Sequence, residues 1–210
     1  GQFDSAQGIL GLGLDYANGP LAVGLAYHNI SNFGGQINNT APVGATSNTR
    51  GLDQWELAIG GSYDFKFVKL FASWQNINQD NVLASVNTLI GTSNSGYGSV
   101  DGNLWNIGGR IPVGANGAVN IAYSYYSNDI SGRKVVNGVT SGNDQKVSNW
   151  GIDYEYSFSK RTTAYAGFNY MDNGDNSALG YAGSGGSGGA VTPTADNSAW
   201  FVGTGIRHTF

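Results

Sequence analysis

The side chains that could support catalysis are few and scattered in this sequence. It contains two histidines, His28 and His208, and no cysteine among 210 residues. Hydrolytic chemistry requires a nucleophile, a base and usually a third group that orients the base. His28 lies where an expected strand meets a loop, and His208 lies beside the terminus, so they do not converge. The sequence therefore predicts no catalytic site and no cofactor.

Two acidic groupings could instead bind a cation. Asp153 and Glu155 are two residues apart and would share one face of a strand. The segment 172–176, from Asp172 to Asn176, is rich in oxygen ligands but lacks the full spacing and the closing Glu of an EF-hand loop. We interpret the first as the acidic lining of a water-filled space and the second as a polar loop tip. No metal site is therefore predicted, although Ca²⁺ binding at 172–176 stays an open alternative.

Composition narrows the class of protein. The 34 glycines, 12 tyrosines and 5 tryptophans favour strands and tight turns over helices. A net charge of -4 without a basic cluster argues against nucleic-acid binding. No apolar run approaches the roughly 20 residues of a transmembrane helix, but a transmembrane strand needs only about 9 to 11, of which alternate side chains face lipid. The composition is therefore compatible with a membrane β-barrel.

Alternation of large apolar with small or polar residues, typical of strands, recurs from end to end of the chain. It predicts about nine strands and no helix. The segments are 7–16, 21–30, 54–65, 68–77, 104–111, 118–126, 147–158, 162–170 and 199–210.

The links between these segments alternate in length. Short links are expected at 17–20, 64–67, 112–117 and 157–161, and long loops at 32–53, 78–103, 127–146 and 171–198. One end of the sheet would thus carry tight turns and the other long loops, as in outer-membrane barrels. We therefore predict an all-β fold, an antiparallel transmembrane β-barrel.

The two faces of each expected strand differ in charge. One parity of every segment carries no Asp, Glu, Lys or Arg, as a lipid-facing surface requires, because Arg or Lys at the bilayer midplane costs roughly 2 to 4 kcal/mol. The opposite parity is predicted to line the lumen. It carries Asp15, Glu56, Lys69, Arg110, Asp153, Glu155 and Arg207.

Aromatic residues mark both ends of the apolar parity. All five tryptophans fall on it, each expected at the long-loop end of its strand, while tyrosines and phenylalanines occupy the short-turn ends. Two such girdles are typical of the two membrane interfaces, and they predict contact with outer-membrane lipid.

The last eleven residues, Trp200-Phe-Val-Gly-Thr-Gly-Ile-Arg-His-Thr-Phe210, resemble the closing strand of Gram-negative porins. Segments 18–27 and 159–170 are also similar to this family, above all to the general trimeric porins of β-proteobacteria. The resemblance implies a sixteen-stranded barrel in the outer membrane, a homotrimer, passive diffusion of ions and small hydrophilic solutes, and no enzymatic activity. It also implies that Phe210 belongs to a signal for barrel assembly.

About nine strands are fewer than such a barrel contains. We therefore expect residues 1–210 to be a single β-barrel domain that is the C-terminal portion of a porin, with about seven strands and the constriction loop in a missing N-terminal part. That part would be a partner of this chain. Two alternatives are an outer-membrane barrel enzyme, which would need His, Ser or Asp converging at one rim, and a soluble all-β binding module or adhesin, which would not need detergent.

Overall fold

A computed structural model of the chain describes residues 8–33, 52–83, 97–131, 135–136, 139–140, 144–174 and 197–210. Nine strands form one sheet in the order β1-β2-β3-β4-β5-β6-β9-β10-β11, and every neighbouring pair is antiparallel. The strands are β1 (Gly8–Asn18), β2 (Leu21–Phe33), β3 (Leu52–Asp64), β4 (Lys69–Leu83), β5 (Tyr97–Val113), β6 (Gly117–Ser131), β9 (Gln145–Ser157), β10 (Thr162–Gly174) and β11 (Ala199–His208). The prediction of an all-β fold with nine antiparallel strands is confirmed.

A separate two-stranded ribbon, β7 (Val135–Val136) with β8 (Val139–Thr140), lies between β6 and β9 in the sequence. Among the described residues, no helix has the length and apolar character needed to cross a membrane. Apart from this ribbon, each strand pairs with the next along the chain, as expected for a sheet built from consecutive hairpins.

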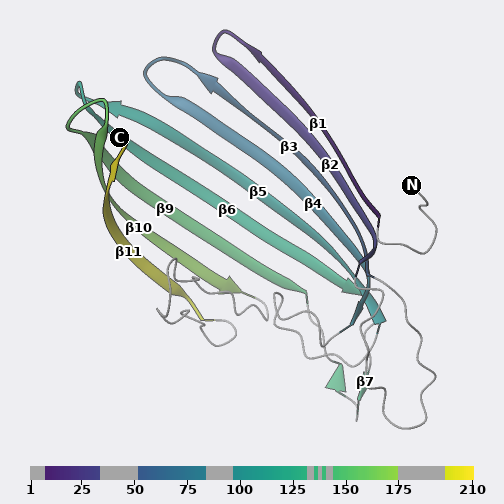
Figure 1. The fold of residues 1–210 in the computed structure, drawn as a ribbon. Helices are drawn as coiled ribbons and strands as arrows, with labels where there is room; N and C mark the ends of the chain where they lie inside the picture. The colour runs from purple at the N-terminus through teal and green to yellow at the C-terminus, as the bar shows by residue number, and fades with distance from the viewer. Residues whose placement is uncertain are drawn as a thin grey trace.

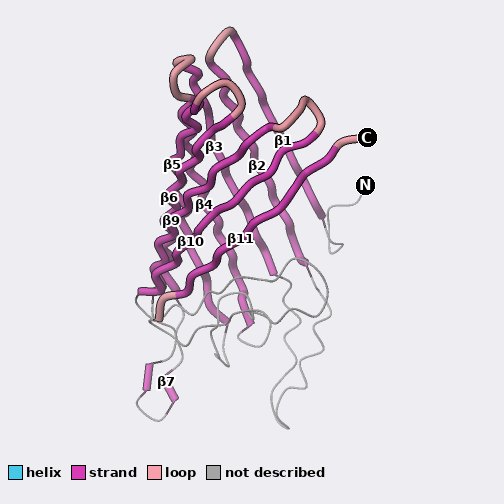
Figure 2. Tube along the Cα trace, turned by 90° about the vertical axis from the view of Figure 1, so that its left-hand side faces the viewer, coloured by secondary structure: helices cyan, strands magenta, loops and turns pink. Residues whose placement is uncertain are grey.

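The sheet is strongly curved, and both its first and its last strand bend toward the same face of the sheet (Figures 1 and 2). The short connections lie together at one end, near the C-terminus, as the alternation of link lengths predicted (Figure 1). Within the described residues, β1 and β11 each pair along one edge only and form the two borders of the sheet.

Backbone geometry explains the tightness of two short connections. Gly19, between β1 and β2, has φ 55°, and Gly114, between β5 and β6, has φ 65°. This left-handed region is accessible to glycine without the steric cost that a Cβ imposes. Lys66 adopts φ 73° in the β3–β4 connection, where its N–H donates to Asp64 Oδ1 at 2.7 Å.

Several strands are longer at the other end than the sequence predicted. β4 continues to Leu83 and β5 begins at Tyr97, so residues 78–83 and 97–103 are strand and not loop. The apolar alternation stops before these residues, but the backbone ladder continues. Polar side chains bond across it, for example Gln79 Nε2 to Gln54 Oε1 at 2.9 Å. The parts of the expected long loops that lie outside the described residues are 34–51, 84–96, 132–134, 137–138, 141–143 and 175–196.

The last strand differs in the opposite sense, because β11 ends at His208 and not at Phe210. Thr209 still donates its backbone N–H to Arg161 O at 2.9 Å, beyond the last ladder pair. The terminal Phe210 is fully exposed, and its ring contacts His208 with centroids 5.0 Å apart.

Candidate functional site

The seven charged residues that were predicted to share one parity do lie on one face of the sheet. Residues directly opposite in an antiparallel ladder project to the same side. One register row joins Lys69, Arg110, Asn120 and Asp153 across four strands, and Glu56 and Glu155 lie on the same face by strand alternation. Asp15 lies on the same face in another row, through Gly24 and Gly60 to Ser73. Arg207 lies on it through Thr163 and Ser157, which has the same parity as Asp153 on β9. We call this the charged face.

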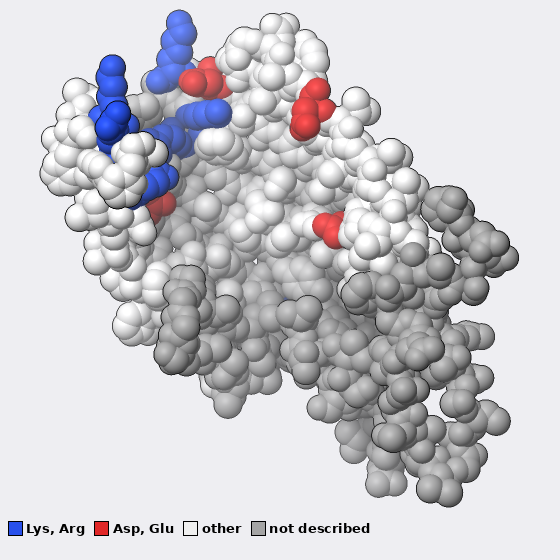
Figure 3. Space-filling model, in the orientation of Figure 1, with Lys and Arg blue, Asp and Glu red and all other residues white. Residues whose placement is uncertain are grey.

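The charged face is the concave one. Figure 3, in the orientation of Figure 1, shows acidic and basic side chains on the side toward which both borders of the sheet curve. Lys and Arg gather at the end that carries the short turns (Figure 3). A surface of this curvature and charge can surround water.

Arg110 is the centre of a polar cluster on this face. Its Nη1 donates to Glu155 Oε2 at 2.5 Å and to Asn120 Oδ1 at 3.2 Å. Asn120 Nδ2 in turn donates to Asp153 Oδ1 at 2.8 Å. The side chains of Arg110 and Glu155 remain 43% and 25% exposed, so the pair is compensated locally but stays accessible to water. These four residues, Arg110, Asn120, Asp153 and Glu155, are the Arg110 cluster.

A second group surrounds Glu56 nearer the opposite end. Glu56 accepts a hydrogen bond from Gln75 Nε2. His28 faces it in the register, and its Nδ1 lies 3.8 Å from Glu56 Oε2, an ion pair only when the imidazole is protonated. Sequence alternation predicted that Glu56 lies on this face. It did not predict the contact with His28, because that contact depends on the register between β2 and β3.

Other side chains of the charged face rest on neighbouring strands. Asp15 lies over Gly24, where an added Cβ would be 2.9 Å from Asp15 Oδ1. Lys69 Nζ lies 5.4 Å from the centroid of the Phe71 ring, at a cation–π distance. Phe71, Asn120 and Gln75 were not predicted as part of the site. All three occupy the same alternate positions of their strands as the charged residues do. Alternation could therefore have found them if uncharged residues had been included.

The second grouping considered for cation binding, residues 172–176, belongs in part to a strand. Asp172 and Asn173 belong to β10 and pair with Ser148 and Val147, so the prediction of a loop tip is wrong for them, because the ladder extends through Gly174. Asn173 is 1% exposed, and its Nδ2 donates to Asn197 O at 2.7 Å. Residues 175–176 lie outside the described residues. No group of three His, Cys, Asp or Glu side chains suited to a metal ion occurs in the described part of the chain.

The convex face is apolar over most of its height. Its exposed residues include Leu14 at 72%, Ile107 at 61% and Ile206 at 71%. All five tryptophans lie on it, and Trp74 and Trp105 contact each other with ring centroids 5.9 Å apart. Tyr and Phe rings cluster at the short-turn end, as in the Tyr63–Phe65 pair at 4.5 Å.

One prediction for the convex face is wrong in detail. Trp74 and Trp105 do not end their strands, since β4 and β5 continue well past them. The added lengths bring charge onto this face, because Asp101 is opposite both Asn78 and Asp129. Lys146 and Asp172 join it on β9 and β10. All of these lie beyond the tryptophans, so the uncharged part of the face ends at the tryptophan level.

Three comparisons with known proteins bear on this arrangement. Residues 1–176 match the profile of the Gram-negative porin family. An outer membrane porin protein of Bordetella pertussis is 30% identical over 209 residues, which are 94% of this chain and 45% of that protein.

Solved structures agree in fold. The anion-selective porin from Comamonas acidovorans superposes with a TM-score of 0.66 at 24% identity, over 96% of this chain and 49% of that one. OmpT of Vibrio cholerae, an outer membrane protein solved in a trimer form, gives 0.60 at 18% identity, over 96% and 56%. The chain thus spans about half the length of the relatives it matches.

The contact between Arg110 and Glu155 leads to a prediction for stability. In a double-mutant cycle with Arg110→Met and Glu155→Gln, we expect a coupling free energy of about 0.2 to 1 kcal/mol, since both groups are partly exposed to screening water. The free energy of unfolding of the four proteins, from urea titration in detergent, measures it. Lys69→Met with Glu155→Gln is the control pair and should be additive. A coupling free energy of equal size in both cycles would show that Glu155 does not interact specifically with Arg110.

Proposed function

Because the chain belongs to the Gram-negative porin family, we propose that it forms one wall of a water-filled channel for passive diffusion of ions and small hydrophilic solutes. The family is one of outer-membrane porins and not of enzymes, and it places the chain in the bacterial outer membrane. The observation that carries the proposal is the separation of a concave charged face from a convex apolar face on one curved sheet.

The charged face is proposed as the lumen wall. Its pore-lining residues are Asp15, Glu56, Lys69, Arg110, Asp153, Glu155 and Arg207. Three of these are cationic and four anionic, and within the Arg110 cluster Glu155 pairs with Arg110 while Asp153 accepts a hydrogen bond from Asn120. This wall alone therefore contributes little net charge to ion selection. The Comamonas porin is described as anion-selective, and in this protein the overall preference would depend on the walls that complete the lumen.

The convex face is proposed as the lipid contact. Its large apolar residues are exposed, which in water would be a liability but in hydrocarbon is the stable arrangement. The tryptophan level and the Tyr and Phe rings at the turns would then lie at the two membrane interfaces. Strand residues beyond the tryptophans would project into water, which accounts for their polar side chains on both faces.

Two partners complete the proposed assembly. Further strands of the same barrel would pair with β1 and β11, because unpaired N–H and C=O groups in hydrocarbon cost several kcal/mol each. Three such barrels would form a homotrimer, as described for the trimer form of OmpT. Phe210 is proposed to act in assembly as part of a terminal signal.

Neighbouring residues of β3 test the assignment of faces. Leu57→Arg, on the convex face, should cost roughly 2 to 4 kcal/mol if the residue lies near the midplane, and should reduce heat-resistant trimer on a gel. Glu56→Arg should assemble almost normally and shift the reversal potential in a salt gradient toward anions, because a cation replaces an anion in the aqueous path. Both are measured in the full-length protein. Good assembly of Leu57→Arg with failure of Glu56→Arg would mean that the faces are inverted.

The need for further strands has its own test. Residues 1–210 refolded alone in detergent should give no stable channel in single-channel recordings, because β1 and β11 leave open edges. Addition of the remaining part of the barrel should restore uniform conductance. Stable, uniform channels from the pure chain would show that this sheet closes without it.

The assembly role of Phe210 predicts a defect in insertion and not in conductance. Phe210→Ala should lower the amount of full-length protein in the outer membrane, while the channels that do form conduct normally. Phe67→Ala is the control, since Phe67 is also an exposed aromatic residue, 74% exposed, at the short-turn end. Equal membrane levels of both variants and the unaltered protein, measured by blotting of outer-membrane fractions, would remove Phe210 from assembly.

A further inference from the structure

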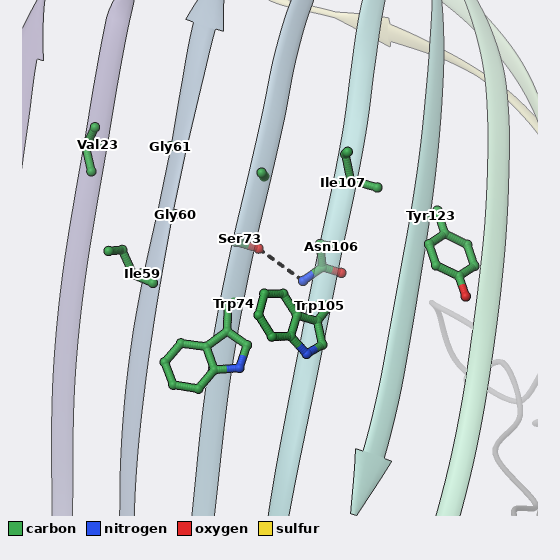
Figure 4. A pocket seen from close by; sticks show the side chains of 11 residues that line it. Val23, Ile59, Gly60, Gly61, Ser73, Trp74, Trp105, Asn106, Ile107 and Tyr123 are labelled. Carbon is green, nitrogen blue, oxygen red and sulfur yellow. Dashed lines mark hydrogen bonds between the residues drawn. The ribbon is translucent and has the colours of Figure 1, made fainter.

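The convex face is not uniformly filled. A hollow of about 530 Å³ opens on it between β2 and β6 (Figure 4). One register row crosses it, from Val23 through Gly61, Ala72 and Ile107 to Tyr123, five strands in all. At about 4.8 Å between strands, this row is on the order of 19 Å long. The hollow is thus an elongated groove and not a round pit.

Two small residues create the groove. Gly61 and Ala72 face each other at the middle of the row, where the other members are large. The row beside it carries Ile59, Trp74 and Trp105, which form a wall toward the tryptophan level (Figure 4). A Cβ at Gly61 would lie 2.9 Å from the backbone oxygen of Ala22, so that position has no room for a side chain.

The lining is hydrocarbon. Aliphatic and aromatic side chains surround it, and two polar lining residues of the opposite parity, Ser73 and Asn106, hydrogen-bond to each other at 3.1 Å. An apolar space of this kind does not hold water well. Left empty, it would forfeit the dispersion contacts that close packing provides. An apolar occupant is therefore favoured.

The wall of the groove is fixed by a polar network on the same face. Trp74 Nε1 donates to Asn103 Oδ1 at 3.2 Å. The buried Asn76 Nδ2 donates to Asp101 Oδ1 at 2.8 Å and also contacts Asn103 Oδ1 at 3.2 Å. Asn76, Asp101 and Asn103 lie just beyond the tryptophans along β4 and β5. Trp74 and Trp105 therefore separate this polar network from the groove, and the hydrogen bond from Trp74 to Asn103 helps to hold the wall in place.

From these observations, we propose that the groove over Gly61 and Ala72 is a binding site for one acyl chain of an outer-membrane lipid, which would lie across β2 to β6 against the wall formed by Ile59, Trp74 and Trp105. The proposal rests on the assignment of the convex face to lipid and goes beyond it, because it distinguishes one retained lipid from the freely exchanging lipid around the barrel. The groove is continuous with that face, and its length and shape suit a single extended chain.

Tryptophan fluorescence gives a direct test on the full-length trimer. One variant keeps only Trp74 and Trp105, and a second keeps only Trp150, with phenylalanine at all other tryptophan positions. Trp105 and Trp150 are matched probes, 55% and 54% exposed on the same face, but only Trp105 lines the groove. A phospholipid with brominated acyl chains, which quenches tryptophan on contact, is titrated into each protein in lipid-free detergent micelles.

We expect quenching in the Trp74/Trp105 protein to saturate at about one lipid per barrel, whereas Trp150 is quenched only gradually as the ratio of lipid to detergent rises. Ala72→Phe should fill the groove and turn the saturating curve into a gradual one. Ala72→Leu provides a milder filling, and Ala166→Phe, on the same face but outside the groove, is the control that should leave saturation intact.

Three results would overturn the proposal. The first is gradual quenching at both probes, and the second is saturation that survives Ala72→Phe. The third is protection of Trp74 and Trp105 in the trimer that disappears when the trimer is dissociated, which would assign the groove to a second copy of the protein. Failure of the lipid assignment itself would be recognised separately, because Trp150 would then remain unquenched even in bilayers made only of the brominated lipid.

Discussion

Backbone hydrogen bonding inside a hydrocarbon layer is the constraint on which the rest of this structure depends. No water is available there, so each strand must find partners on both sides, and consecutive antiparallel hairpins satisfy this requirement with the shortest connections. The nine strands of the sheet pair in this way without a crossing connection. Successive side chains of a strand project to opposite faces of the sheet. The lipid proposed for the convex face favours apolar side chains, and the water proposed for the concave face favours polar ones.

The extent of the membrane explains where the sequence changes character along each strand. Between the short turns and the tryptophan level, the convex face is apolar and the concave face polar. Past the tryptophans, β4 and β5 continue as strands with Asn76, Asp101 and Asn103 bonded to one another on the formerly apolar face. Both faces of these extensions would be in water, so the backbone ladder persists while the alternation disappears.

Residue alternation was sufficient to predict the strands, their order of pairing through short turns and the charged residues of one face. It failed where the pattern itself is absent: residues 78–83 and 97–103 are strand without apolar alternation, and Asp172 and Asn173 are part of β10. Contacts between strands were also beyond prediction. The bonds from Arg110 to Asn120 and Glu155, and the approach of His28 to Glu56, depend on register and rotamers, which alternation does not encode. The groove over Gly61 and Ala72 likewise appears only when the register sets two small residues opposite each other.

The separation of solvents by strand parity is the central claim, and a nitroxide scan of β3 tests it most directly. The chain has no cysteine, so single cysteines at positions 54–63 of the full-length protein in bilayers can each be labelled without background from it. Accessibility to oxygen, which concentrates in hydrocarbon, should peak at odd positions such as Leu57 and Ile59. Accessibility to a water-soluble nickel complex should peak at even positions such as Glu56 and Ala58. A scan in which the two quenchers rise and fall together, or in which the parities are exchanged, would contradict the account.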